Sequence, residues 1–179
     1  SDAKVKTIGE NILQFIRGYK DQQGKTEDKP FRERESRQGD IVNSEIWYTG
    51  NSSSSPMLYV GGNDGMLHGF SAKNGEEKIA YVPHGVIPYL KELANPDYTH
   101  RYYVDGSPMA GNIKDGSAEK TMLVGTLGAG GKGYFVLDVT NPATFSEAGA
   151  ASIVQIDRTH PNRNCIEKTL ADGTKTPQY

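Results

Sequence analysis

Hydrophobic residues recur at helical spacing at the start of the chain and in short β-type runs after it. Five apolar residues are spaced by three or four positions and would share one face of a helix over 4–17: Val5, Ile8, Ile12, Phe15 and Ile16. Thr7 and Glu10 have the spacing of a capping box, so the helix starts either there or at Asp2. Gly18 tolerates the left-handed conformation that commonly ends a helix, and it is predicted to stop this one.

The segment 19–38 is polar and charged, which is the composition of a linker. Its last part alternates in sign through Arg32, Glu33, Arg34, Glu35 and Arg37. These charges could form a recognition patch, or they could belong to a solvated strand in which they compensate one another. Because exposed ion pairs are weak, we favour the solvated strand.

Short apolar runs separated by glycine turns predict β-strands from residue 39 onward. The run 39–50 is interpreted as a strand that carries Ile41, Val42, Ile46 and Trp47. The runs 57–62, 66–72 and 78–83 follow, joined by turns at 63–65 and 73–75 that each contain Gly. Three short strands connected in this way predict an antiparallel meander.

A helical segment interrupts the β pattern before it resumes. Val86, Leu90 and Leu93 have helical spacing within 85–95, and Asn95-Pro96 ends this segment. Further strands are predicted at 100–108, which runs into an Asp-Gly turn, and at 121–128 and 134–142. The last strand is nearly continuous in apolar residues and is expected to be buried on both faces. After about residue 145 only 153–156 resembles a strand.

The strands form an internal repeat. Residues 57–62 match 121–126, which aligns Val60 with Val124, and residues 67–75 match 134–142. Two copies of strand, glycine turn, strand and polar turn predict propeller blades. The predicted fold class is therefore mainly β: a partial β-propeller of about two antiparallel blades, with an N-terminal helix and a short inserted helix.

Composition narrows the class of protein further. A length of 179 residues suits one domain with a core, and a net charge of −2 is too small for a disordered chain or for binding nucleic acid by charge. The single cysteine, Cys165, excludes an internal disulfide and a cysteine-rich zinc site. No apolar run is long enough for a membrane-spanning helix, and the first residues lack the apolar core of a signal peptide. We expect a soluble segment whose secretion signal, if it has one, lies outside these residues.

Candidate catalytic motifs lack the context that their chemistry needs. The Gly-rich segment 128–133 follows a strand but precedes the β-type run YFVLDV instead of a helix, so we expect a steric role rather than phosphate binding. Histidines 68, 84, 100 and 160 have no metal-ligand spacing, and the Asp residues at 64, 105, 115 and 172 each precede a turn glycine. No catalytic, cofactor-binding or metal-binding residue is predicted.

Five ordered blocks resemble one family. They are FRERESRQGDIVNS (31–44), LYVGGNDGMLHGFSA (58–72), YVPHGVIPYL (81–90), YTHRYYVDGSP (98–108) and MLVGTLGAGGKGYFVLDVTNP (122–142). Together with the helix that ends at Arg17-Gly18, they resemble the beginning of the C-terminal β-propeller of the PilY/PilC family of type IV pilus tip-associated adhesins and biogenesis factors.

The resemblance implies an extracytoplasmic propeller module at the pilus tip, cell surface or outer membrane. It implies minor pilins and a host or abiotic surface as partners, and a role in pilus extension, adhesion and twitching motility. Calcium binding is implied for the parent protein, but the acidic calcium loop has no counterpart here, so no cofactor is expected in this segment. Two blades cannot close a propeller, and we expect missing blades or other copies to complete it.

The predicted organisation has four parts: a lead-in helix at 1–18, a polar linker at 19–38, partial propeller blades at 39–145, and a divergent tail at 146–179 that is mobile or belongs to a further blade. The leading prediction is a non-enzymatic pilus biogenesis and adhesion module with binding loops at 19–38, 96–100 and 111–120. The alternatives are a fragment of a quinone-dependent dehydrogenase-like propeller and an outer-membrane assembly scaffold.

Overall fold

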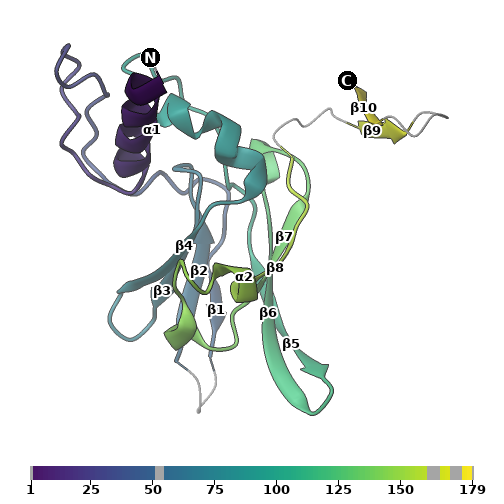
Figure 1. Cartoon of the computed structure of the whole chain (residues 1–179). Coiled ribbons are helices and arrows are strands. Elements are labelled where there is room, and N and C mark those ends of the chain that lie inside the picture. Colours follow the sequence, from purple (N-terminus) through teal and green to yellow (C-terminus); the bar gives the residue numbers. More distant parts are fainter. Residues whose placement is uncertain (1, 51–54, 161–165, 170–174, 179) are drawn as a thin grey trace.

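The protein consists of two four-stranded antiparallel sheets with a layer of helices at one end (Figure 1). The computed structural model describes residues 2–50, 55–160, 166–169 and 175–178. In the first sheet the strands follow chain order: β1 (Trp47–Thr49), β2 (Met57–Gly61), β3 (Leu67–Ser71) and β4 (Glu77–Tyr81). The second sheet has the same order: β5 (Met109–Asp115), β6 (Ala118–Thr126), β7 (Tyr134–Asp138) and β8 (Val154–Asp157).

The two sheets pack face to face, with corresponding strands beside one another. The first strands β1 and β5 are in contact, and the fourth strands are joined by a hydrogen bond of 2.5 Å from the Tyr81 hydroxyl to Asp157. Between the two sheets, the ring centroids of Tyr81 and Phe135 lie 5.1 Å apart. Leu67, Leu123 and Leu137 are fully buried in the same core. Two meanders stacked in the same sense, with unclosed edges, are two blades of a β-propeller, so the predicted fold class is confirmed.

The helical layer consists mainly of α1 (Asp2–Ile16) and the 3₁₀ helix η1 (His84–Ala94), which is the predicted inserted helix. Only the end of α1 is buried: Phe15 and Ile16 pack in the core, whereas Val5 is 70% exposed. Val5 and Ile8, which share one face of the helix with Phe15 and Ile16, therefore lie outside the core. No helix in the described part of the chain has the length and apolarity needed to cross a membrane.

The ends of α1 answer the question that the sequence left open. The helix starts at Asp2, and the Thr7 hydroxyl donates to the Ala3 carbonyl within it instead of capping a later start. Gly18 has φ +99° and follows the last turn, which confirms its predicted role. Three short elements complete the structure: η2 (Gly128–Gly130), η3 (Pro142–Thr144) and α2 (Ala150–Ile153).

One predicted strand is much shorter than expected and another is absent, and side chains accept hydrogen bonds from several backbone amides of both segments. In 39–50 only Trp47–Thr49 is a strand, and Ile41, Val42 and Ile46 are exposed. The amides of Gly39 and Asn43 donate to the carboxylates of Asp64 and Asp105. Residues 100–108 form no strand, and the Tyr103 amide donates to the Asn63 side chain.

The second sheet also differs from prediction in its third and fourth strands. β7 is buried on one face only, because Phe135 and Leu137 point to the core while Tyr134 is 45% exposed. The predicted end of the blades at residue 145 is too early, since β8 pairs with β7 and supplies the fourth strand. A further hairpin follows, formed by β9 (Ile166–Thr169) and β10 (Lys175–Gln178). Cys165 lies outside the described residues.

The strand registers correct the internal repeat by one residue. β3 and β7 begin at Leu67 and Tyr134, as the predicted alignment requires, so His68 corresponds to Phe135. His68 is paired with Val60, but Phe135 is paired with Gly125 rather than Val124. Val60 is therefore equivalent to Gly125. Side chains alternate between the two faces of a strand. A shift of one residue therefore means that the β6 residues matched to β2 in the sequence alignment lie on the opposite face of their sheet.

Candidate functional site

A buried histidine between two carboxylates lies at the junction of the first sheet and the helical layer. His68 is 4% exposed on β3. Its Nε2 lies 3.0 Å from both carboxylate oxygens of Asp64, and its Nδ1 lies 2.6 Å from Oε1 of Glu77. Asp64 also accepts the Gly39 amide at 2.7 Å. The cluster joins the β2–β3 turn, β4 and the segment before β1.

The surroundings of His68 keep it protonated. Burial by itself lowers its pKa, but the hydrogen bonds and charges of Asp64 and Glu77 outweigh burial and raise the pKa to about 9. A protonated imidazole donates through both nitrogens and has none left to act as a base or to bind a metal. The geometry therefore identifies a structural ion cluster.

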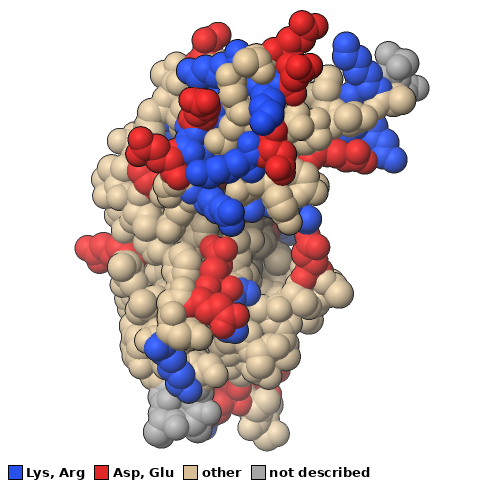
Figure 2. All heavy atoms as spheres, turned by 90° about the vertical axis from the view of Figure 1, so that its left-hand side faces the viewer, with Lys and Arg blue, Asp and Glu red and all other residues tan. Residues whose placement is uncertain are grey.

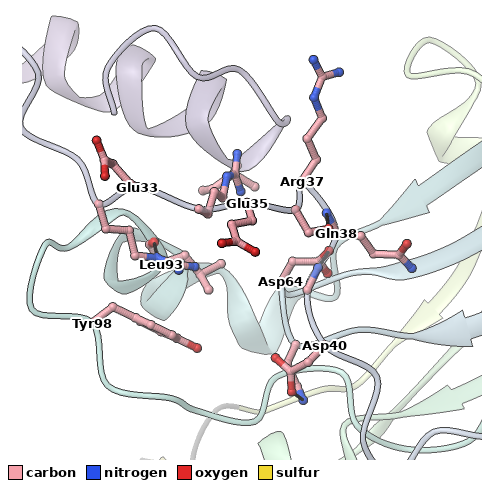
Figure 3. A pocket seen from close by; sticks show the side chains of 14 residues that line it. Glu33, Glu35, Arg37, Gln38, Asp40, Asp64, Leu93 and Tyr98 are labelled. Carbon is pink, nitrogen blue, oxygen red and sulfur yellow. Dashed lines mark hydrogen bonds between the residues drawn. The ribbon is translucent and has the colours of Figure 1, made fainter. Parts of the chain in front are cut away.

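A polar pocket of about 390 Å³ opens beside this cluster (Figure 3). The segment 32–40, the Asn63-Asp64 turn and the residues Leu93 and Tyr98 line it. Figure 3 shows Glu35 directed into the pocket, while Glu33 and Arg37 point away from it. Asp40 is held by Asn63 at 3.1 Å and by His100 at 2.9 Å. These hydrogen bonds, working against burial, lower the pKa of Asp40.

The alternating charges of 32–37 are not a solvated strand of compensating pairs. Arg34 lies over the Phe15 ring, 3.9 Å from its centroid, and donates to the Phe15 carbonyl. Arg32 lies 4.4 Å from the centroid of Tyr98 and donates to the Leu93 carbonyl at 2.5 Å. Arg32 and Arg34 thus point inward and connect α1 with η1 and Tyr98, through cation–π contacts with the two rings and hydrogen bonds to the two carbonyls. The spacing of two residues between the arginines could have indicated this role, because it places both side chains on one side of an extended segment. We interpreted that spacing as alternation of charge.

The Gly-rich segment 128–133 has the predicted steric role. The segment contains only the three-residue 3₁₀ helix η2, and the strand β7 rather than a longer helix follows it. A Cβ on Gly130 would collide with the Tyr103 carbonyl. Gly133 has φ +93°, and a Cβ there would collide with the Arg158 carbonyl. Through these close approaches the segment before β7 packs against the backbone of Tyr103 and of Arg158, the residue that follows β8.

A family model provides the comparison that decides the family. The PilY1 β-propeller domain model matches residues 38–178, which cover both sheets. The chain belongs to this family. Its resemblance to PilY/PilC proteins is thereby confirmed, and the two sheets are blades of a PilY1-type propeller.

Curated relatives agree with the family model. The chain is 40% identical over 168 residues to a type IV pilus biogenesis factor PilY1 homolog of Xylella fastidiosa, covering 76% of this chain and 11% of that protein. It is 40% identical over 164 residues to the type IV pilus biogenesis factor PilY1 of Pseudomonas aeruginosa PAO1, covering 76% of this chain and 14% of that protein. The chain thus spans only about an eighth of the length of these relatives. No solved structure matches it.

The PilY1-type blades do not present the predicted binding loops equally. The segment 96–100 is tied down through the His100–Asp40 pair, and 19–38 is anchored by buried Phe31. Residues 111–120 are not a loop but the far end of the β5–β6 hairpin, which projects away from the helical layer (Figure 1). On the face seen in Figure 2, charged side chains gather in the upper part, over the helical layer.

Calcium does not fit the carboxylates near the pocket. Asp40, Asp64 and Asp105 already accept hydrogen bonds from protein donors, with Asp105 bound by the Asn43 amide group at 2.8 Å. In the part of the chain that the structure describes, no group of three or more acidic, His or Cys side chains is placed to hold a metal ion. No metal ligand is assigned.

Proposed function

We propose that this chain supplies two consecutive blades of the propeller of a type IV pilus biogenesis factor and acts there as a non-enzymatic scaffold. One observation carries the proposal: two complete four-stranded blades, matched by the PilY1 β-propeller model, are stacked in the same sense. The parent protein is extracytoplasmic, at the pilus tip, cell surface or outer membrane. Its partners are minor pilins and the surface to which the cell attaches.

The side chains that could perform chemistry support a structural role. Both nitrogens of His68 donate to carboxylates, and Asp157 is occupied by the Tyr81 hydroxyl and the His84 amide. The β5–β6 hairpin is the projecting element that is best placed to contact a partner, because residues 111–119 at its far end are exposed. In this proposal the blades hold that hairpin rigidly, and pilus extension, adhesion and twitching depend on the surfaces so presented.

The proposal is tested by removing residues 38–160 in frame from the chromosomal gene of the bacterium that encodes this protein. We expect sheared surface pilin and twitching zones to decrease strongly while outer-membrane porin levels stay unchanged. Unchanged surface pili would contradict the proposal, and depleted porins would favour an outer-membrane assembly scaffold instead. A quinone absorption band in the purified full-length protein, with or without added quinone and calcium, would favour the dehydrogenase-like alternative.

A further inference from the structure

One of the four edge strands of the two sheets lacks the features that usually prevent an edge from pairing with another chain. These edge strands are β1, β4, β5 and β8. β1 and β8 have only three and four residues, and β4 has a register shift and carries the charges of Glu77 and Lys78. β5 has seven residues, pairs with β6 without a register shift and is uncharged from Met109 to Ile113. A long, regular edge of this kind is a template for an added strand.

The backbone of β5 presents hydrogen-bonding groups on this edge. The Thr121 amide donates to a threonine hydroxyl that follows β7, and the Thr121 carbonyl accepts the Val139 amide, so both groups point away from β5. Asn112, which is opposite Thr121, therefore exchanges no backbone hydrogen bonds with β6. Because bonded and non-bonded pairs alternate in an antiparallel ladder, the free edge presents the amides and carbonyls of Ala110, Asn112 and Lys114.

The side chains of β5 leave room for a partner strand. Gly111 lies between Met109 and Ile113 on one face, and a Cβ on Gly111 would have no atom within 4 Å. Met109 is 61% exposed and Ile113 is 48% exposed. β7 pairs with β6 over 122–126, so beyond Gly111 the hairpin projects past the sheet (Figure 1). A large apolar side chain of an added strand would fill the space beside the glycine.

The charge of Lys114 distinguishes between possible partner strands. Lys114 forms no ion pair with a described residue, whereas its neighbour Asp115 is paired with Lys120 at 2.7 Å. In antiparallel pairing with a second copy of β5, free-edge residues face free-edge residues, so Lys114 would lie opposite Ala110, Asn112 or the other copy's Lys114. None of these is acidic. A strand that compensates this charge must therefore have a different sequence.

We propose that the free edge of β5 binds an extended segment of another protein as an added antiparallel strand. Main-chain hydrogen bonds hold the segment, an aromatic or branched apolar side chain lies beside Gly111, and an acidic side chain lies opposite Lys114. This inference rests on the proposed function, in which the β5–β6 hairpin contacts a partner, and it adds the chemistry by which that partner is recognised.

Binding of a synthetic strand to the full-length protein tests the proposal. The probe is the fluorescent peptide Thr-Glu-Val-Thr-Tyr-Thr-Val, which in antiparallel register places Glu opposite Lys114 and Tyr opposite Gly111; fluorescence anisotropy measures its binding. The amides of its second, fourth and sixth residues would face β5. We expect N-methylation of these three amides to weaken binding at least about tenfold, while N-methylation of the third, fifth and seventh leaves it unchanged.

Variants of the protein provide a second test. Asn112→Pro removes an amide from the free edge but no backbone hydrogen bond to β6, and it should weaken binding at least about fivefold. Asn112→Ala is the matched control, because it keeps the amide and loses the same side-chain bond to Thr121; its affinity should stay within about twofold of wild type. Lys114→Glu should weaken binding severalfold, and a peptide with Lys in place of Glu should restore it.

Three results would overturn the proposal. The first is no saturable binding of the parent peptide, and the second is equal binding of the two N-methylated forms. The third is self-association of the full-length protein that the peptide inhibits, which would assign the edge to a second copy. Because this assay needs no pili, its failure is distinguishable from failure of the pilus assay.

Discussion

His68 is a cation at a position where the second blade has a core phenylalanine. The equivalent residue, Phe135, is fully buried between the sheets. At His68 the charge is accommodated because Asp64 and Glu77 accept both of its N–H groups. Removing one member of a buried ion cluster leaves the others uncompensated and is strongly destabilising. The stability of the first blade is therefore expected to depend on whether both ring nitrogens of His68 are protonated.

Substitution of His68 is expected to expose this dependence through pH. The folded pKa of about 9 lies above the unfolded value of 6.5, so the stabilisation is complete below pH 6.5 and is lost as pH rises through 9. The shift corresponds to about 3 kcal/mol. Urea unfolding should show His68→Gln less stable than wild type by about this amount at pH 6, with the gap closing above pH 9.

The exposed His100–Asp40 pair provides the control for this measurement. Both side chains are about half exposed, so His100→Gln should change the free energy of unfolding by less than about 1 kcal/mol. A constant difference between wild type and His68→Gln from pH 6 to pH 10 would show that His68 is not charged in the folded protein.

At the scale of elements, the two ends of the molecule are built differently. The helical layer is fastened by Arg32, Arg34 and Phe15, whose contacts combine ring stacking with hydrogen bonds to carbonyl oxygens. The far end of the β5–β6 hairpin is exposed, and side-chain pairs of Lys120 with Asp115 and of Thr121 with Asn112 support its ladder there. Such an element can change at its tip without disturbing the core.

Shortening the hairpin is therefore expected to separate adhesion from folding. Replacing 113–120 in the full-length protein with a two-residue Asn-Gly turn keeps the Asn112–Thr121 and Met109–Val124 pairs and should leave protein level and surface pili unchanged. Cell attachment should fall severalfold if the tip contacts the surface or a pilin.

A deletion of 26–28, in the loop closed by the Gln23–Phe31 bridge, is the matched control and should preserve attachment. Attachment that is insensitive to the hairpin but lost with this control would move the contact surface to the helical layer.

In the molecule as a whole, the two sheets cover each other's inner faces but leave the outer face of the second sheet partly exposed. The inner faces bury Tyr59, Leu123 and Phe135 completely, while the outer face of the second sheet leaves Val124 and Ile156 half exposed. Its edges also carry unpaired strand backbone, which invites association. The isolated unit and the same unit within a longer protein should consequently behave differently.

Sedimentation velocity of the isolated 179-residue chain measures this difference. We expect concentration-dependent association through the apolar row on the outer face of the second sheet, which consists of Met109, Val124, Val136 and Ile156. Val124→Lys should reduce the association constant at least about threefold. Val5→Lys adds the same charge at an exposed position outside the row and should leave association unchanged. A wild-type chain that stays monomeric at all concentrations would show that the row is tolerated in water.

Much of this architecture was predictable because local sequence controls strand and turn formation. The strands around Val60 and Phe135 were recognisable from short apolar runs and glycine turns. The strand expected at 39–50 is confined to Trp47–Thr49 and the one at 100–108 is absent, and side chains of Asp64, Asp105 and Asn63 accept hydrogen bonds from backbone amides there. The His68 cluster was missed because Glu77 comes from another strand and carries no spacing signal.

The two blades, the inserted helix, the end of α1 and the family could be inferred from the order of amino acids alone, because apolar period, turn glycines and ordered motifs are properties of neighbouring residues. Four features became known from the folded molecule: the face that each strand buries, the one-residue register between Val60 and Gly125, the protonation of His68 and the inward direction of Arg32 and Arg34. Each of these depends on atoms brought together from distant parts of the chain, and their burial and electrostatic energies exist only after the sheets have packed.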